Sequence, residues 1–92
     1  KLGLDLQPLT QEMANRLKIP DTKGMLIVNV DPNGPAAEKG IQRGDVLLEV
    51  NRQEVTTFDD VKSAIEKSGS RPILLLIARG GQTSYVTIQP SR

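Results

Sequence analysis

The side chains most often used in covalent and metal chemistry are missing from this sequence. It contains no histidine and no cysteine, which excludes Ser-His-Asp and Cys-His nucleophiles and the common zinc sites. Residue count alone would permit a serine with a lysine base, but no serine lies in the sharp turn of an activated nucleophile. The serines in helix, loop, strand or tail positions are Ser63, Ser68, Ser70, Ser84 and Ser91. We therefore expect no catalytic residue, and this chain alone is not expected to be an enzyme.

Two other patterns could carry chemistry and are better explained by local structure. Asp59 and Asp60 are adjacent, so on a helix their carboxylates point in different directions and suit a helix N-terminus better than acid-base work. Gly80-Gly81 lies between two predicted strands and does not precede a helix. This position indicates a hairpin turn and not a phosphate-binding loop. We expect neither a metal site nor a cofactor.

Length and composition limit the remaining function classes. The chain has 92 residues, a formal net charge of +1, one Phe and one Tyr. This length suits a single domain over residues 1–92, and the mixed charges and scarce aromatics argue against nucleic-acid binding. The longest apolar run, Ile73 to Ala78, is far shorter than the roughly 20 residues that span a bilayer. Because the chain starts at Lys1 and reads as structured from Leu2, we expect it to be excised from a longer protein.

Apolar periodicity and turn residues predict a mainly β fold with two or three helices. Leu2, Leu4 and Leu6 alternate with polar residues or glycine, and Pro8 ends this strand. The other predicted strands cover 25–30, 46–50, a short stretch near 55, 73–78 and 84–88. One predicted helix follows Thr10, a second starts at Pro35 and a third follows Thr57. This order indicates a small, partly open β-barrel or sandwich with helices at its ends.

Two neighbouring segments in the middle of the chain carry a more specific pattern. They are Pro35-Ala36-Ala37-Glu38-Lys39-Gly40-Ile41 and Arg43-Gly44-Asp45-Val46-Leu47-Leu48-Glu49-Val50-Asn51. This pattern resembles the PDZ family of peptide-binding modules, and the resemblance extends over nearly the whole chain. Because the first strand opens the domain and the 73–88 hairpin closes it, the resemblance implies the permuted topology of bacterial PDZ domains. Many relatives have glycine where this chain has Arg52, so a two-residue type I′ turn at Asn51-Arg52 is not expected.

Further segments are similar to the HtrA family of periplasmic serine proteases, including the Deg proteases. They are Leu6-Gln7-Pro8-Leu9-Thr10, Leu17-Lys18-Ile19-Pro20 and Lys23-Gly24, while 47–51 and 74–81 look more like the second, C-terminal PDZ domain than the first. The resemblance implies a parent that is an ATP-independent serine endoprotease with chaperone-like quality control in the bacterial periplasm. The catalytic domain of that parent would lie upstream of Lys1.

The resemblance also implies where a peptide binds. Lys1-Leu2-Gly3-Leu4 looks like the carboxylate-binding loop of the family, in which glycine lets successive backbone N–H groups point into one concavity. The segment Thr57 to Gly69 looks like the helix that lines the groove. The candidate peptide-binding residues are Leu2, Gly3, Leu4, Asp5 and Leu6 on the loop and strand, and Phe58, Val61, Lys62 and Ile65 on the helix.

Each candidate also has a purely structural interpretation. Leu2-Gly3-Leu4 could be the start of a buried strand, Val61 could be a core residue only, and Lys62 could be a solvated lysine. The expected partners are C-terminal or extended peptides of unfolded or substrate proteins, together with other domains or protomers of the parent. Two alternatives stay open: a scaffold whose groove assembles the protease, and a PDZ domain of a site-2 metalloprotease or a type II secretion component.

Overall fold

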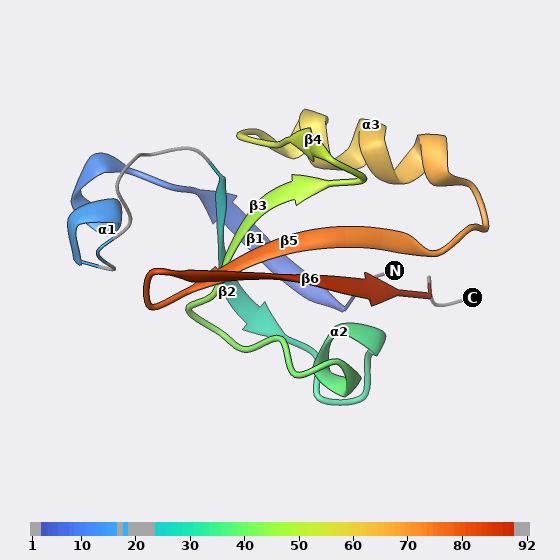
Figure 1. Cartoon of the computed structure of the whole chain (residues 1–92), viewed down its shortest axis with the longest axis horizontal. Coiled ribbons are helices and arrows are strands. Elements are labelled where there is room, and N and C mark those ends of the chain that lie inside the picture. Colours follow the sequence, from blue (N-terminus) through green and yellow to red (C-terminus); the bar gives the residue numbers. More distant parts are fainter. Residues whose placement is uncertain (1–2, 17, 19–23, 90–92) are drawn as a thin grey trace.

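Six strands in one antiparallel sheet and three helices make up the part of the chain that the computed structural model describes, residues 3–16, 18 and 24–89 (Figure 1). The strands are β1 (Leu4–Pro8), β2 (Met25–Val30), β3 (Val46–Val50), β4 (Gln53–Glu54), β5 (Ile73–Arg79) and β6 (Gln82–Ile88). The helices are α1 (Gln11–Arg16), α2 (Pro35–Glu38) and α3 (Phe58–Ser68). The predicted content of strands and helices is confirmed. None of the described helices is long and apolar enough to cross a membrane.

The order of the strands leaves two different edges. The sheet runs β1-β2-β3-β5-β6, with β4 paired to β3. The β1–β2 register shifts between Asp5 and Leu6, whereas β5 and β6 pair without interruption from Ile73↔Ile88 to Arg79↔Gln82. Among the described residues, β1 pairs with β2 alone and β6 with β5 alone, so the two edges lie at opposite ends of the sheet.

An aliphatic core joins the sheet to α2 and α3, which lie on opposite sides of the strands in Figure 1. Its buried members are Met25, Ile27, Ala36, Ile41, Leu47, Val50, Val55, Val61, Ala64, Ile73, Leu75, Ile77 and Ile88. Burying one of the larger side chains in this list, Val, Ile, Leu or Met, contributes about 1.5 to 3 kcal/mol. Both aromatic residues are outside this core, since Phe58 and Tyr85 are more than half exposed.

Local hydrogen bonds fix the start of α3. The Thr57 hydroxyl accepts a bond from the Asp60 N–H at 3.1 Å, and the Asp60 carboxylate accepts bonds from the N–H groups of Thr56 and Thr57 at 3.0 and 3.2 Å. The capping-box spacing predicted from the sequence is therefore used, although Asp replaces the usual Glu or Gln. These bonds, that from the Thr56 N–H first, hold the pKa of Asp60 below its usual value.

The turn between β3 and β4 differs from the prediction. Asn51 and Arg52 both have positive φ, 53° and 68°, between the paired residues Val50 and Gln53, so a two-residue turn of the primed type forms without glycine. Asn51 favours this conformation, and its backbone N–H and side-chain oxygen bond to Leu74 at 2.7 and 3.0 Å. The prediction was wrong because it considered the backbone preference of Arg52 and not the contacts that hold its neighbour.

A second turn joins distant parts of the chain. Gly44 has φ of +96°, as expected for a tight turn, and the following Asp45 is 2% exposed. The Asp45 carboxylate accepts two bonds from the Arg79 guanidinium, at 2.8 and 2.7 Å, and one from the Gln42 N–H at 2.9 Å. This pairing raises the pKa of Arg79 through hydrogen bonding and charge attraction. The turn therefore anchors the end of β5 to the loop before β3.

Candidate functional site

A groove of about 340 Å³ lies between β1 and α3. Its lining consists of Leu4 and Leu6 from the strand and Phe58, Asp59, Val61, Lys62, Ile65 and Glu66 from the helix. Leu4, Leu6 and Ile65 are half-buried and pack against the main core. The floor of the groove is therefore an apolar surface that lies on the core and stays partly open to solvent beside the outer edge of β1.

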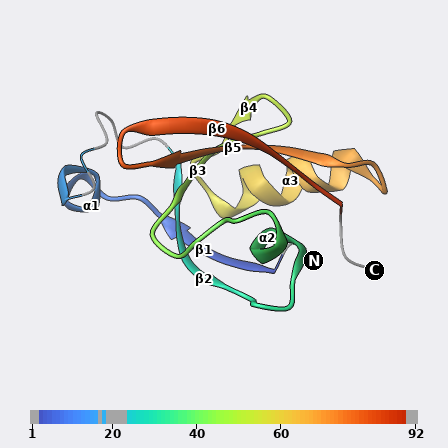
Figure 2. The same cartoon turned by 60° about the horizontal axis from the view of Figure 1, so that its bottom comes forward.

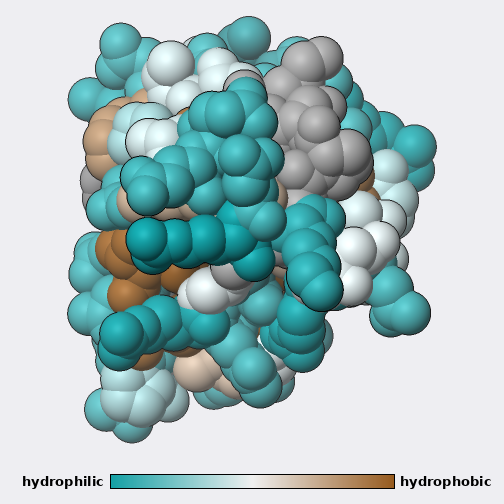
Figure 3. Space-filling view, turned by 90° about the vertical axis from the view of Figure 1, so that its left-hand side faces the viewer, coloured by the Kyte–Doolittle hydropathy of each residue, from teal (hydrophilic) through white to brown (hydrophobic). Residues whose placement is uncertain are grey.

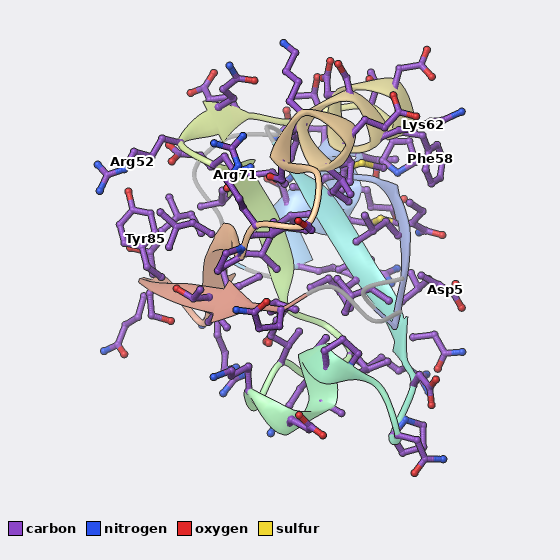
Figure 4. The ribbon with its side chains drawn as sticks, turned by 90° about the vertical axis from the view of Figure 1, so that its right-hand side faces the viewer. Asp5, Arg52, Phe58, Lys62, Arg71 and Tyr85 are labelled. Carbon is purple, nitrogen blue, oxygen red and sulfur yellow. The ribbon has the colours of Figure 1, made fainter. Side chains whose placement is uncertain are left out.

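Helical spacing explains how α3 presents its lining. Phe58, Val61, Lys62 and Ile65 are spaced i, i+3, i+4 and i+7, which places them on one face of a helix. Val61 is 7% exposed and belongs to the core, whereas Phe58 is 56% exposed. Figure 4 shows Phe58 and Lys62 close together on the same side of the molecule as Asp5. The helix thus gives the groove an apolar base, one exposed aromatic ring and one ammonium group.

The structure brings most of the predicted residues together. Leu4, Leu6, Phe58, Val61, Lys62 and Ile65 line one groove, as the predicted strand–helix pair requires. Asp5 is exposed and does not line the groove; its carboxylate accepts a bond from the Asn29 amide at 3.4 Å. Leu2 lies outside the described residues.

Gly3 is fixed at the end of β1 by its backbone and its surroundings. Its φ is +78°, and a Cβ there would lie 3.2 Å from the Gly34 Cα. The Gly3 carbonyl accepts a bond from the Asp31 N–H at 2.8 Å. These contacts hold the loop against the start of α2, which Figure 2 shows beside the N-terminal end of the described chain. A larger residue would be strained both by φ and by crowding.

Sequence reasoning missed two acidic residues of the lining. Asp59 was assigned to the helix dipole alone, and Glu66 was not considered, yet both border the groove. The available signal was their spacing, three residues before and four after Lys62. The rim therefore carries charges of both signs. Among the described residues, no group of His, Cys, Asp or Glu side chains could hold a metal ion.

The end of the molecule that carries α1 has a different surface. At the end of the molecule formed by α1 and the β5–β6 turn, most of the surface is hydrophilic and hydrophobic atoms gather at one margin (Figure 3). There α1 is attached by a small second cluster of buried residues, Leu9, Ala14, Val46 and Ala78. The coloured part of this side shows no broad apolar face.

Comparison with known proteins decides the family. A family model described as "PDZ domain" matches residues 26–79, more than half of the chain. This chain belongs to the PDZ domain family. The matched segment runs from β2 to β5 and contains α3, one wall of the groove.

Relatives place this PDZ domain among those of HtrA and DegP-like serine endoproteases. A probable periplasmic serine endoprotease, DegP-like, from Chlamydia pneumoniae is 37% identical over 91 residues, which cover 98% of this chain and 19% of the relative. A protein of the same description from Brucella suis is 41% identical over 71 residues, which cover 74% of this chain and 14% of the relative. The chain thus spans less than a fifth of the length of each of these curated relatives.

Two solved structures share the fold. The PDZ domain of HtrA3 bound to a phage-derived ligand has a TM-score of 0.84 at 24% identity, covering 99% of this chain and 84% of that one. The HtrA-type protease AlgW with a decapeptide has a TM-score of 0.77 at 28% identity, and the match covers 100% of this chain and 30% of that one. The mainly β PDZ fold expected from the sequence is confirmed.

Proposed function

We propose that this PDZ domain captures the free C-terminus or an extended segment of another protein by adding it as a strand to β1. The observation that carries this proposal is the apolar groove beside a strand that pairs, among the described residues, with β2 alone. A strand laid along β1 would gain backbone hydrogen bonds from β1 and would place alternate side chains toward α3. Leu4, Leu6 and Ile65 would receive the apolar ones.

The end of the groove suits a carboxylate. Gly3 has a positive φ, and a glycine in this conformation lets consecutive N–H groups converge on an anion without a cationic side chain. In this proposal the amides of Leu2, Gly3 and Leu4 bind the terminal carboxylate, and the last side chain of the peptide lies against Leu4 and Ile65. Phe58 and Lys62 would contact a side chain further from the terminus, and Asp5 would lie beside the added strand.

The relatives suggest the setting. The HtrA-type neighbours were solved with peptides or a peptide-like ligand, and the curated relatives are named as probable periplasmic endoproteases. In this proposal residues 1–92 are one PDZ domain of a longer HtrA/Deg-type protease, whose catalytic domain lies elsewhere in the parent. The PDZ domain would deliver unfolded substrates to that catalytic domain for quality control in the bacterial periplasm.

Two lysine substitutions on α3 test the groove. Ile65→Lys places an ammonium group on the apolar floor and should weaken binding of a peptide ending in valine at least about tenfold. A tenfold loss corresponds to roughly 1.4 kcal/mol, which is less than the contribution of burying one aliphatic side chain. Ser63→Lys adds the same charge at an exposed position that does not line the groove, and should leave the affinity unchanged. Titration calorimetry with melting curves for both variants measures this. Equal affinities for folded Ile65→Lys and the wild-type chain would contradict the proposal.

A further inference from the structure

The outer edge of β6 lacks the features that usually protect an exposed strand. Among the described residues, β6 pairs only with β5, and its register is continuous over all seven residues. The segment Gln82-Thr83-Ser84-Tyr85-Val86-Thr87-Ile88 contains no charge and no proline. Edge strands normally carry lysine, proline or a bulge that prevents pairing with another chain. This edge is open to strand addition.

The hairpin geometry tells which backbone groups face outward. Gly80 and Gly81 both have positive φ, 56° and 84°, so Arg79 and Gln82 close a two-residue turn as a hydrogen-bonded pair. Alternation along an antiparallel ladder then directs the N–H and C=O groups of residues 83, 85 and 87 away from β5. Leu74 supports this assignment, because it lies opposite Thr87 and yet exchanges hydrogen bonds with Asn51 on its other side.

These outward groups are symmetric about Tyr85, the middle residue of β6. A second β6 running antiparallel would place Tyr85 opposite Tyr85, and Thr83 opposite Thr87 on both sides. Each of these three residue pairs would exchange backbone hydrogen bonds in both directions. The side chains of Thr83, Tyr85 and Thr87 are all exposed, and they share one face by strand alternation. Aromatic and Thr–Thr cross-strand pairs both favour such pairing.

We propose that the outer edge of β6 binds a second copy of this chain in a symmetric antiparallel pair centred on Tyr85. Tyr85 is 54% exposed and its ring lies 5.8 Å from the Arg52 guanidinium; Figure 4 shows both residues on the side away from Phe58 and Lys62. Two Arg52 side chains would approach the same axis, and one strand pair buries little area. We therefore expect a weak dimer, with Kd on the order of 0.1 to 1 mM.

The proposed dimer does not rest on peptide capture. β1 and β6 are at opposite ends of the sheet order, so pairing through β6 leaves the β1 groove of each copy open. Loss of dimerisation and loss of peptide binding are therefore separate results. Side-by-side copies would present two grooves on one continuous sheet.

Sedimentation equilibrium from micromolar to millimolar concentration tests the dimer on the whole 92-residue chain. The mean mass should rise with concentration, and amide NMR shifts should change with it chiefly at Thr83, Tyr85 and Thr87. Tyr85→Lys sets like charges directly opposite each other and should weaken association at least about tenfold, whereas Ser63→Lys should not. Thr87→Pro removes an outward N–H that β5 does not use, and should also weaken it.

Melting curves establish that the variants fold. A monomeric mass at millimolar concentration would overturn the proposal. Association that survives both β6 variants, or concentration-dependent shifts confined to β1 and α3, would overturn it as well, since copies would then meet through the groove.

Discussion

Gly3 and Ile65 contribute to the proposed peptide contact in different ways. Gly3 supplies a backbone conformation, because its φ of +78° and its closeness to Gly34 admit no side chain without strain. Ile65 supplies apolar surface that stays half-buried beside the main core. We therefore expect a change at Gly3 to affect binding of the terminal carboxylate and a change at Ile65 to affect binding of the last side chain.

A pair of glycine substitutions separates strain from function at the loop. Gly3→Ala and Gly40→Ala both place a side chain at positive φ, but a Cβ at Gly40 meets nothing within 4 Å. Each should lose roughly 1 kcal/mol or more of stability, and Gly3→Ala should lose more because of Gly34. Only Gly3→Ala should weaken peptide binding. Chemical denaturation and calorimetry measure both effects, and loss of binding in Gly40→Ala alone would contradict the assigned loop.

The fixed N-terminus of α3 decides which of its residues face the groove. The reciprocal bonds between Thr57 and Asp60 set where the helix begins, and this start places Phe58, Val61, Lys62 and Ile65 on the groove side. The capping pattern and the helical spacing were both readable from the sequence. The groove was expected only from the family resemblance, since its existence depends on how α3 packs across β1, a contact between segments at least fifty residues apart.

The cap should make part of the stability of α3 depend on pH. Since the pKa of Asp60 is lowered by folding, its ionised carboxylate stabilises the folded state above its unfolded pKa of about 3.9. This contribution is lost as pH falls through the lower folded-state value. The melting temperature of wild type should thus exceed that of Asp60→Asn near neutral pH, and the difference should shrink as the pH falls below the unfolded-state pKa of Asp60. A pH-independent difference would show that the charge of Asp60 contributes nothing.

The sheet separates two edges with different properties. The β1 edge is bordered by a helix and an apolar groove, has an irregular register and carries Asp5. The β6 edge is uncharged and continuous. One domain of this size can therefore offer one edge to a peptide and the other to a second copy.

The sequence was informative about this arrangement wherever a local pattern decides the structure. Alternation in β1, the double glycine before β6 and the capping box of α3 predicted their elements correctly. The primed turn at Arg52 was not predicted, because its energy depends on the hydrogen bonds of Asn51 to Leu74. The helical spacing of the acidic rim was readable, but only the docking of α3 beside β1 shows that Asp59 and Glu66 border the groove.

In the function proposed for this domain, the groove beside β1 captures a peptide by its C-terminus. Its most direct test is a pair of NMR titrations with one peptide that ends in valine, as the free acid and as the amide. We expect the acid to bind with Kd on the order of 1 to 100 μM and the amide at least about tenfold more weakly, because the amide lacks the charge that the loop N–H groups bind. The shifts should lie at Gly3 to Gln7 and along α3. Equal affinities for acid and amide, or shifts confined to other parts of the chain, would contradict C-terminal capture.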